Sequence, residues 1–243
     1  AVDRRYPFVS RGSFNCSDAA LNKIWDLCLE TLSACTTDSF TDCPWRERAL
    51  WVNDTLVENI VALQAFGDNR LNAHVLRLAV SNRRKDGWIP GMCPDMGDLH
   101  NVLVPVNLLL VIILKDYFLY TGDTALVKEL LPELLEVLKL FESLMDSDHQ
   151  IVPPKEMWNF VDWSYIPHGL SHDGRNSSLL NWLYCSAVNS AAELLPATGE
   201  NSEAAEKWRA KAVQAAAGIK KRFWQENIKM YSEFEETDTT KLK

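Results

Sequence analysis

The stretch LVPVNLLLVIILKDYFLYTGD, residues 103–123, decides the fold class of this 243-residue chain. Apolar side chains fall on every side of a helix over residues 103–121, so other elements have to bury such a helix all round. Gly122 is typical of a helix end, and Asp123 is typical of the cap of a following helix. The apolar run is too short to span a bilayer. We therefore predict a buried core helix and no membrane association.

Further helical patterns lie on both sides of this core helix. We predict helices at 18–35, 44–66, 70–84, 123–131, 132–145, 176–195 and 202–224. Pro132 is expected to divide the pattern that follows Asp123, because proline interrupts the hydrogen bonding of a helix. Two loops, 86–102 and 147–175, contain many glycine, proline and aromatic residues, and the tail after Asn227 is polar and lacks structure signals.

Short connections alternate with long loops and no strands intervene, which predicts an all-α fold with inner and outer helices. A closed six-hairpin toroid contains twelve helices, more than the seven or eight expected here. We therefore predict a partial (α/α)6 six-hairpin toroid over residues 16–243, truncated at its C-terminus, or a smaller helical array. Residues 1–15 show no helical period and are expected to form an extended lead-in or the end of a preceding β domain. The sequence contains no repeat of fixed period, which argues against a solenoid.

Composition limits the classes of partner and the compartment. A formal net charge of -8 argues against nucleic acid, because phosphate binding requires clustered Lys and Arg. Nine Trp provide flat faces on which sugar rings can lie, although a large helical core also uses Trp. None of the six Cys forms a C-x-x-C pair, and Cys28 and Cys35 lie about 10 Å apart on one helix, too far to bridge. Free, mostly buried thiols favour a reducing compartment, and hence the cytoplasm slightly over the periplasm or secretion.

Chemistry is expected in the segment Asp42–Asp54, DCPWRERALWVND. On the predicted helix, one stripe carries Glu47, Trp51, Asp54 and Glu58. Trp45 begins an apolar stripe on the other side, which is expected to face the core. A solvated face is the common explanation of an acidic stripe near a helix start. Trp51, a large aromatic residue among carboxylates, favours a lined cavity instead.

Such a cavity suits general acid catalysis. Carboxylates crowded together raise the pKa of one of them, which keeps a proton available for transfer. Arg46 and Arg48 are expected to hold the other carboxylates ionised.

The same segment, with GSFNCSD at 12–18 and WNFVDW at 158–163, resembles the signature of the bacterial α-L-rhamnosidases, glycoside hydrolase family 78. The resemblance extends over essentially the whole chain, and the DCP-x-RER run is its specific part. It implies an α/α six-hairpin barrel that removes terminal α-L-rhamnosyl groups with inversion and without a cofactor. The implied partner is a rhamnose-containing glycoside or oligosaccharide, whereas the oligomeric state cannot be derived.

The resemblance also implies roles for single residues. Glu47 takes the position of the general acid, Asp42 and Asp54 take positions that bind rhamnose hydroxyls, and Trp51 walls the sugar subsite beside Arg46. Inversion requires a second carboxylate, roughly 6.5–9.5 Å from the acid, that deprotonates a water molecule. In the family this base is a Glu later in the barrel. The chain ends at Lys243 before a matching segment, so we expect the base to be absent and the chain alone to be inactive.

Aromatic residues in the two long loops are candidate sugar contacts. We favour Asp162 and Trp163, because loops over a rigid scaffold commonly carry binding residues. Trp88 is a weaker candidate of the same kind. For Trp158 and Phe160, a core or turn role is as good an explanation as a sugar contact.

Other chemistries find little support. His168, His172 and Asp173 have a spacing that suits metal ligands on a helix, but the surrounding glycines and proline predict a loop, so we expect no metal site. Serine nucleophile and phosphate-binding glycine motifs are absent. Two alternative functions stay in view: a non-catalytic carbohydrate-binding or scaffolding helical domain, and an α/α-barrel glycosidase that acts on another sugar.

Overall fold

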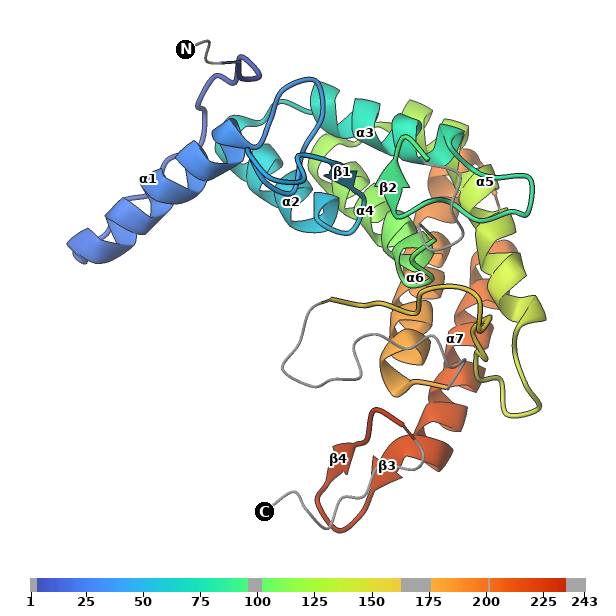
Figure 1. The fold of residues 1–243 in the computed structure, drawn as a ribbon. Helices are drawn as coiled ribbons and strands as arrows, with labels where there is room; N and C mark the ends of the chain where they lie inside the picture. Colours follow the sequence, from blue (N-terminus) through green and yellow to red (C-terminus); the bar gives the residue numbers. More distant parts are fainter. Residues whose placement is uncertain (1–3, 96–101, 163–175, 201, 235–243) are drawn as a thin grey trace.

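The computed structural model describes residues 4–95, 102–162, 176–200 and 202–234 and is mainly helical (Figure 1). The helices are α1 (Ala19–Ala34), α2 (Thr55–Phe66), α3 (Arg70–Ser81), α4 (Val106–Thr121), α5 (Thr124–Ser143), α6 (Ser178–Thr198) and α7 (Ser202–Phe223). Two antiparallel pairs of short strands accompany them: β1 (Leu50–Trp51) with β2 (Met92–Cys93), and β3 (Trp224–Gln225) with β4 (Met230–Tyr231). The prediction of an all-α fold is confirmed.

The helices form an inner and an outer row. Helix α2 packs on α4 and α4 packs on α6, while α3 and α5 contact each other and cover α4 from the outside. Helix α7 lies along α6. The two rows follow an open arc from α1 to α7 (Figure 1). This is the arrangement expected of a partial α/α toroid, because paired inner and outer helices bury the apolar stripe between them.

Helix α4 is the core element that its sequence predicts. Val106, Leu110 and Leu114 are almost completely buried, and the exposed side chains of the helix, Leu119 and Tyr120, lie in its last turn. Gly122 ends the helix with a left-handed φ of 66°. The carboxylate of Asp123 accepts a hydrogen bond from the backbone N–H of Leu126 at 3.0 Å and caps α5. Both predicted boundary signals are confirmed.

Asn107 connects this core helix to the loop that leads to the site. Its side-chain oxygen accepts from the backbone N–H of Ile89 at 2.8 Å, and its amide nitrogen donates to the Ile89 carbonyl at 3.0 Å. Asn107 is fully buried, so this pair of hydrogen bonds fixes the depth of the loop below the surface.

Three predicted element boundaries are wrong. Helix α5 continues through Pro132, which lies on the exposed face, so the carbonyl of Lys128 that proline leaves without a donor faces water. Helix α6 likewise passes Pro196 and ends only at Gly199, whose φ is 96°. In the tail after Asn227, which was expected to lack structure, β4 pairs with β3, and Tyr231 packs on Trp224 with ring centroids 5.0 Å apart.

The N-terminal residues that are described, 4–15, are extended and lie against the helices. The backbone N–H groups of Arg11 and Gly12 both donate to the carbonyl of Ala65, and the ring of Phe8 stacks on Phe66 at a centroid distance of 4.1 Å. These contacts hold the lead-in beside the C-terminal end of α2.

All six cysteines are free thiols, and three of them, Cys35, Cys93 and Cys185, are buried. The prediction of free thiols is confirmed, whereas the expectation that most are buried holds for only half of them. In the part of the chain that the structure describes, no helix is both long and apolar enough to cross a membrane.

Candidate active site

The segment expected to begin the second helix forms a loop, and α2 starts only at Thr55. Asp42 closes this loop: its backbone N–H donates to the carbonyl of Ala49, and its carboxylate accepts from the N–H of Ala49 at 2.9 Å. Arg48 has a left-handed φ of 50°. Leu50 and Trp51 then pair with β2. Strand pairing and the carboxylate contact supply the hydrogen bonds that a helix would have supplied, so the predicted helical start at Pro44 is wrong.

The loop changes the surroundings of two residues from those predicted. Trp45, expected to face the core, is 91% exposed. Arg48, expected to hold the carboxylates of the site ionised, lines a different cavity. Both differences follow from the loop, because the helical spacing that assigned these side chains to faces does not apply there.

The loop nevertheless brings the predicted site residues together in one cavity of about 630 Å³. Six residues singled out in the sequence line it: Asp42, Arg46, Glu47, Trp51, Asp54 and Asp162. Apolar side chains complete its wall: Met92, Leu103, Trp158 and Phe160. The cavity therefore has an acidic side and an apolar side.

Two donors hold the carboxylate of Glu47 at the cavity. A guanidinium nitrogen of Arg46 donates to Oε1 at 3.0 Å, and the indole Nε1 of Trp51 donates to Oε2 at 3.0 Å. The Glu47 side chain is 44% exposed, so it is open to a ligand while its orientation is fixed. Trp51 in turn is positioned by the pairing of β1 with β2.

Asp54 stands at the start of α2, where burial and neighbouring charges act on it. Burial, followed by the carboxylates of Asp42, Asp162 and Glu47, raises the pKa of Asp54 to about 6. The cause is the desolvation of a charge together with repulsion between like charges. The carboxyl group of Asp54 therefore stays protonated in acidic solution and loses its proton near pH 6.

Glu58, one turn further along α2, is affected more strongly. Burial is the largest cause, followed by the charges of Asp54 and Asp42, and together they raise the pKa of Glu58 to about 9. Glu58 is therefore a neutral carboxylic acid at pH 7. It lies in an apolar groove of about 700 Å³. This groove shares Asp42, Asp54 and Asp162 with the cavity at Glu47.

The loops at the far wall are positioned by the start of α4. The backbone N–H of Val104 donates to the carbonyl of Trp158 at 3.0 Å, and the N–H of Trp158 donates to the carbonyl of Val102. The rings of Trp158 and Phe160 lie 4.6 Å apart. Trp158 and Phe160 both line the cavity. Phe160 is also buried, so it combines a core position with a place in the cavity wall, the two roles considered for it in the sequence analysis.

One predicted sugar contact lies elsewhere, and others are not described. Trp88 is only 3% exposed and packs edge-on against Phe141, so it belongs to the core and does not line the cavity. Two other predictions fall outside the described residues: the sugar contact at Trp163, and the rejected metal site at His168, His172 and Asp173. Within the described ranges, no group of three His, Cys, Asp or Glu is placed to hold a metal ion.

Sequence reasoning missed four residues of the cavity wall: Ala49, Asn53, Met92 and Leu103. Met92 is brought there by the pairing of Trp51 with Met92, between strands too short to give an alternating pattern. Leu103 was assigned to the first turn of the core helix, but it precedes α4 and turns toward the site.

Comparison with protein families gives a match over residues 10–242 to the bacterial α-L-rhamnosidase six-hairpin glycosidase domain. Comparison with curated proteins found no match.

Among solved structures, a family 78 rhamnosidase of Bacillus sp. GL1 is similar, with a TM-score of 0.84 and 24% identity over 95% of this chain and 23% of that chain. A rhamnosidase from Klebsiella oxytoca with rhamnose bound has a TM-score of 0.80 and 22% identity over 92% of this chain and 42% of that one. A Streptomyces avermitilis α-L-rhamnosidase complexed with L-rhamnose has a TM-score of 0.73 and 18% identity over 90% of this chain and 20% of that chain.

At these identities the solved structures show the fold, and the chain spans less than half the length of each of the three. The family match covers nearly all of the chain and includes the loop and strands that build the cavity. The chain belongs to the family of bacterial α-L-rhamnosidase six-hairpin glycosidase domains.

Proposed function

We propose that this chain carries the sugar-binding and proton-donating part of an α-L-rhamnosidase active site, with Glu47 as the general acid. The observation that carries the proposal is that one cavity combines Glu47 with Asp42 and Asp54. These are the three positions to which the family resemblance assigns the acid and the binding of rhamnose hydroxyls. The similar Klebsiella oxytoca rhamnosidase has rhamnose bound, which supports the same class of ligand here.

The two sides of the cavity suit a 6-deoxy sugar. The side-chain oxygens of Asp42 and Asp54 accept hydrogen bonds from hydroxyl groups on one edge of the ring. The ring faces of Trp51 and Trp158 provide apolar surface for the C–H face of the sugar. Met92, a partly exposed residue on the apolar side, offers contact to the methyl group that a 6-deoxy sugar carries in place of a hydroxymethyl group.

In the proposed reaction, Glu47 transfers a proton to the glycosidic oxygen as the bond to the anomeric carbon breaks. A water molecule attacks the opposite face and gives its proton to a second carboxylate. The anomeric configuration is thereby inverted, and the first product is β-L-rhamnose. We assign the second carboxylate to a later hairpin of the barrel, in agreement with the family resemblance.

The experiment that tests this function offers the purified full-length protein, with the second carboxylate in place, a panel of nitrophenyl glycosides. We expect hydrolysis of the α-L-rhamnoside and at least tenfold slower hydrolysis of the α-L-arabinofuranoside, α-D-mannoside and β-D-galactoside. Proton NMR of the first turnover is expected to show the β anomer of rhamnose. Preference for another glycoside, or release of the α anomer first, would contradict the proposal.

The panel also separates the two alternatives. Hydrolysis of a different glycoside alone would identify an α/α-barrel glycosidase for another sugar. Saturable binding of L-rhamnose without any hydrolysis would identify a carbohydrate-binding helical domain.

A further inference from the structure

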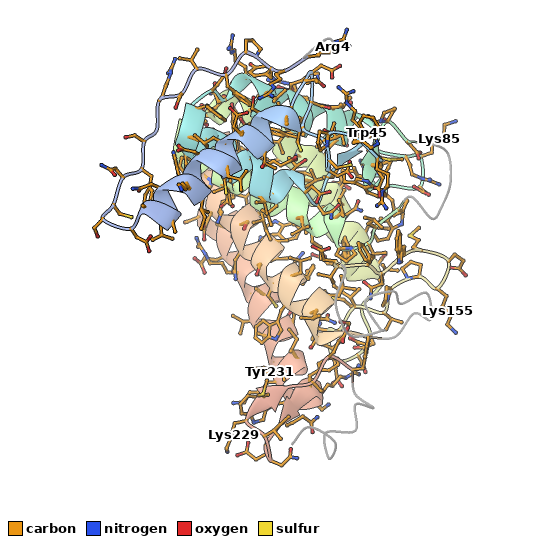
Figure 2. All side chains as sticks on the ribbon, turned by 60° about the vertical axis from the view of Figure 1, so that its left-hand side comes forward. Arg4, Trp45, Lys85, Lys155, Lys229 and Tyr231 are labelled. Atoms are coloured by element: carbon orange, nitrogen blue, oxygen red, sulfur yellow. The ribbon has the colours of Figure 1, made fainter. Side chains whose placement is uncertain are left out.

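A second cavity, of about 440 Å³, lies beside the proposed sugar cavity and shares Ala49 and Met92 with it. It is lined on its other sides by Arg4 from the lead-in, by Asp38 and Ser39 from the turn after α1, and by Arg48 from the site loop. Unlike the groove at Glu58, it is built from loops and from the β1–β2 pair. Arg4 and Trp45, which belong to these two loops, lie at the same end of the molecule (Figure 2).

The charge of this second cavity is opposite to that of the chain. Two guanidinium groups face a single carboxylate, although the formal net charge of the chain is -8. Among the described residues, neither Arg4 nor Arg48 forms an ion pair within 4.0 Å, whereas Arg77 and Arg83 are each paired with a glutamate on α5. Both arginines are exposed, so a ligand has only to displace water from their guanidinium groups.

The one acidic residue in the cavity is already engaged. The hydroxyl of Thr37 donates to Oδ1 of Asp38 at 3.0 Å. This hydrogen bond is the largest of several causes, including the more distant charge of Arg4, that lower the pKa of Asp38. The two arginines outnumber Asp38, so the cavity carries a net positive charge.

The backbone at Arg48 directs two consecutive side chains to two different cavities. Glu47 faces the sugar cavity, and Arg48, with its left-handed φ of 50°, faces the second one. A side chain other than glycine in this conformation is strained, and the double contact between Asp42 and Ala49 holds it there. Residues with strained backbone conformations are concentrated at active sites and ligand-binding sites.

We propose that this second cavity binds the carboxylate of an acidic sugar to which the terminal rhamnose is attached. The inference rests on the proposed function, because a general acid must lie beside the glycosidic oxygen, so the leaving portion of the substrate begins next to Glu47. Its next neighbour along the chain is Arg48. A guanidinium group matches a carboxylate with two parallel hydrogen bonds, and Arg4 and the hydroxyl of Ser39 add further donors. The substrate class is therefore a rhamnosyl uronate.

The test compares two disaccharides of the same linkage, α-L-rhamnosyl-(1→4)-D-glucuronate and α-L-rhamnosyl-(1→4)-D-glucose. They differ only at C6 of the second sugar, which is a carboxylate in one and a hydroxymethyl group in the other. Calorimetry measures the affinity for each in a Glu47→Gln background, so that hydrolysis does not consume the ligand, and the variants below are made in the same background. We expect the glucuronate to bind about tenfold more tightly at low salt, as for one charge-assisted contact, and the advantage to shrink as salt rises.

Three variants assign this preference to the cavity. Arg48→Asn keeps a residue that tolerates a left-handed φ, and Arg4→Gln removes the second guanidinium. Each is expected to reduce the preference to threefold or less, and binding of the neutral disaccharide reports that the variant is folded. Arg11→Gln, an exposed arginine of the same lead-in that does not line the cavity, is expected to keep the full preference.

The outcomes separate this inference from the proposed function. Equal affinities of the Glu47→Gln protein for the two disaccharides, or a preference unchanged when Arg48→Asn or Arg4→Gln is added, would overturn the acidic-sugar subsite while rhamnose binding stands. Failure of the wild-type protein to bind L-rhamnose or either disaccharide would overturn the proposed function and this inference with it.

Discussion

Replacing Glu47 by glutamine is expected to reduce the turnover of an alkyl α-L-rhamnoside by about 10²–10⁴-fold. An alkoxide is a poor leaving group and needs the proton that Glu47 supplies, whereas a nitrophenolate leaves with little help. The loss is therefore expected to be at least tenfold smaller for the nitrophenyl rhamnoside. The binding of L-rhamnose should change little, because glutamine keeps the size of the side chain and the contact with the Trp51 indole.

Glu226 provides a matched control for this substitution. Its carboxylate also accepts a hydrogen bond from an indole, Nε1 of Trp224 at 2.7 Å, and also pairs with a cation, but it lies outside the cavity. Glu226→Gln is expected to leave both rhamnosides unaffected. Equal losses on the alkyl and nitrophenyl substrates in Glu47→Gln would assign Glu47 to binding and exclude it as the proton donor.

Replacing Glu58 by glutamine is expected to change how stability depends on pH. The folded state holds the Glu58 proton up to a pKa of about 9, whereas the unfolded chain releases it near the ordinary value of 4.5. The folded protein thus binds more protons between pH 4.5 and 9, so its free energy of unfolding falls as pH rises through this window. Glutamine stays neutral and avoids this loss. Near pH 9 we expect Glu58→Gln to be more stable than the wild-type protein by up to about 6 kcal/mol, the full effect of a pKa shift from 4.5 to about 9, and near pH 5 to be similar.

The surroundings of Glu58 explain why its ionisation is so costly. Oε2 is buried and accepts no hydrogen bond from the described residues, and apolar side chains of α1, α2 and α4 line the groove around it. The titratable groups that face it are Asp54 on its own helix, Asp42 from the site loop and the thiol of Cys35 at the end of α1. None of these carries a positive charge that would stabilise the ionised form.

Urea unfolding curves at pH 5, 7 and 9 measure this effect. Glu203→Gln is the control, because Glu203 is an exposed residue of α7 whose partner is Lys207 at 2.8 Å. Its curves are expected to parallel those of the wild-type protein at each pH. Wild-type and Glu58→Gln stabilities that differ by the same amount at pH 5 and pH 9 would show that Glu58 does not titrate as described.

The sequence predicts a helix best where its apolar residues and its end signals all lie within one segment of the chain. The apolar pattern of α4, the Gly122 stop and the Asp123 cap depend on neighbours in the chain, so they could be predicted from the sequence alone. The break predicted at Pro132 was wrong because the effect of a proline on α5 depends on which face of the helix meets solvent. Tertiary packing determines that face.

The grouping of six candidate residues in one cavity agrees with the sequence analysis, whereas the geometry of the cavity could not be predicted. Glu47 and Trp51 are four residues apart, a spacing that a helix also brings together, so the expected contact occurs although the segment is a loop. The pairing of β1 with β2 joins residues distant in sequence, and local periodicity contains no record of it. For the same reason Trp88 looked like a loop aromatic, whereas the hydrogen bonds of Asn107 to Ile89 draw its loop into the core.

The most direct test of the account is to titrate the protein with L-rhamnose and follow the indole N–H resonance of Trp51 by NMR, assigned with a Trp51→Phe variant. The indole donates to Glu47 in the cavity wall, so it senses any ligand that reaches the acid. The account predicts a saturable shift of this resonance with L-rhamnose and a much weaker response to L-fucose, whose hydroxyls are arranged differently. A Trp51 resonance that L-rhamnose leaves unchanged, while the rest of the spectrum shows a folded protein, would contradict it.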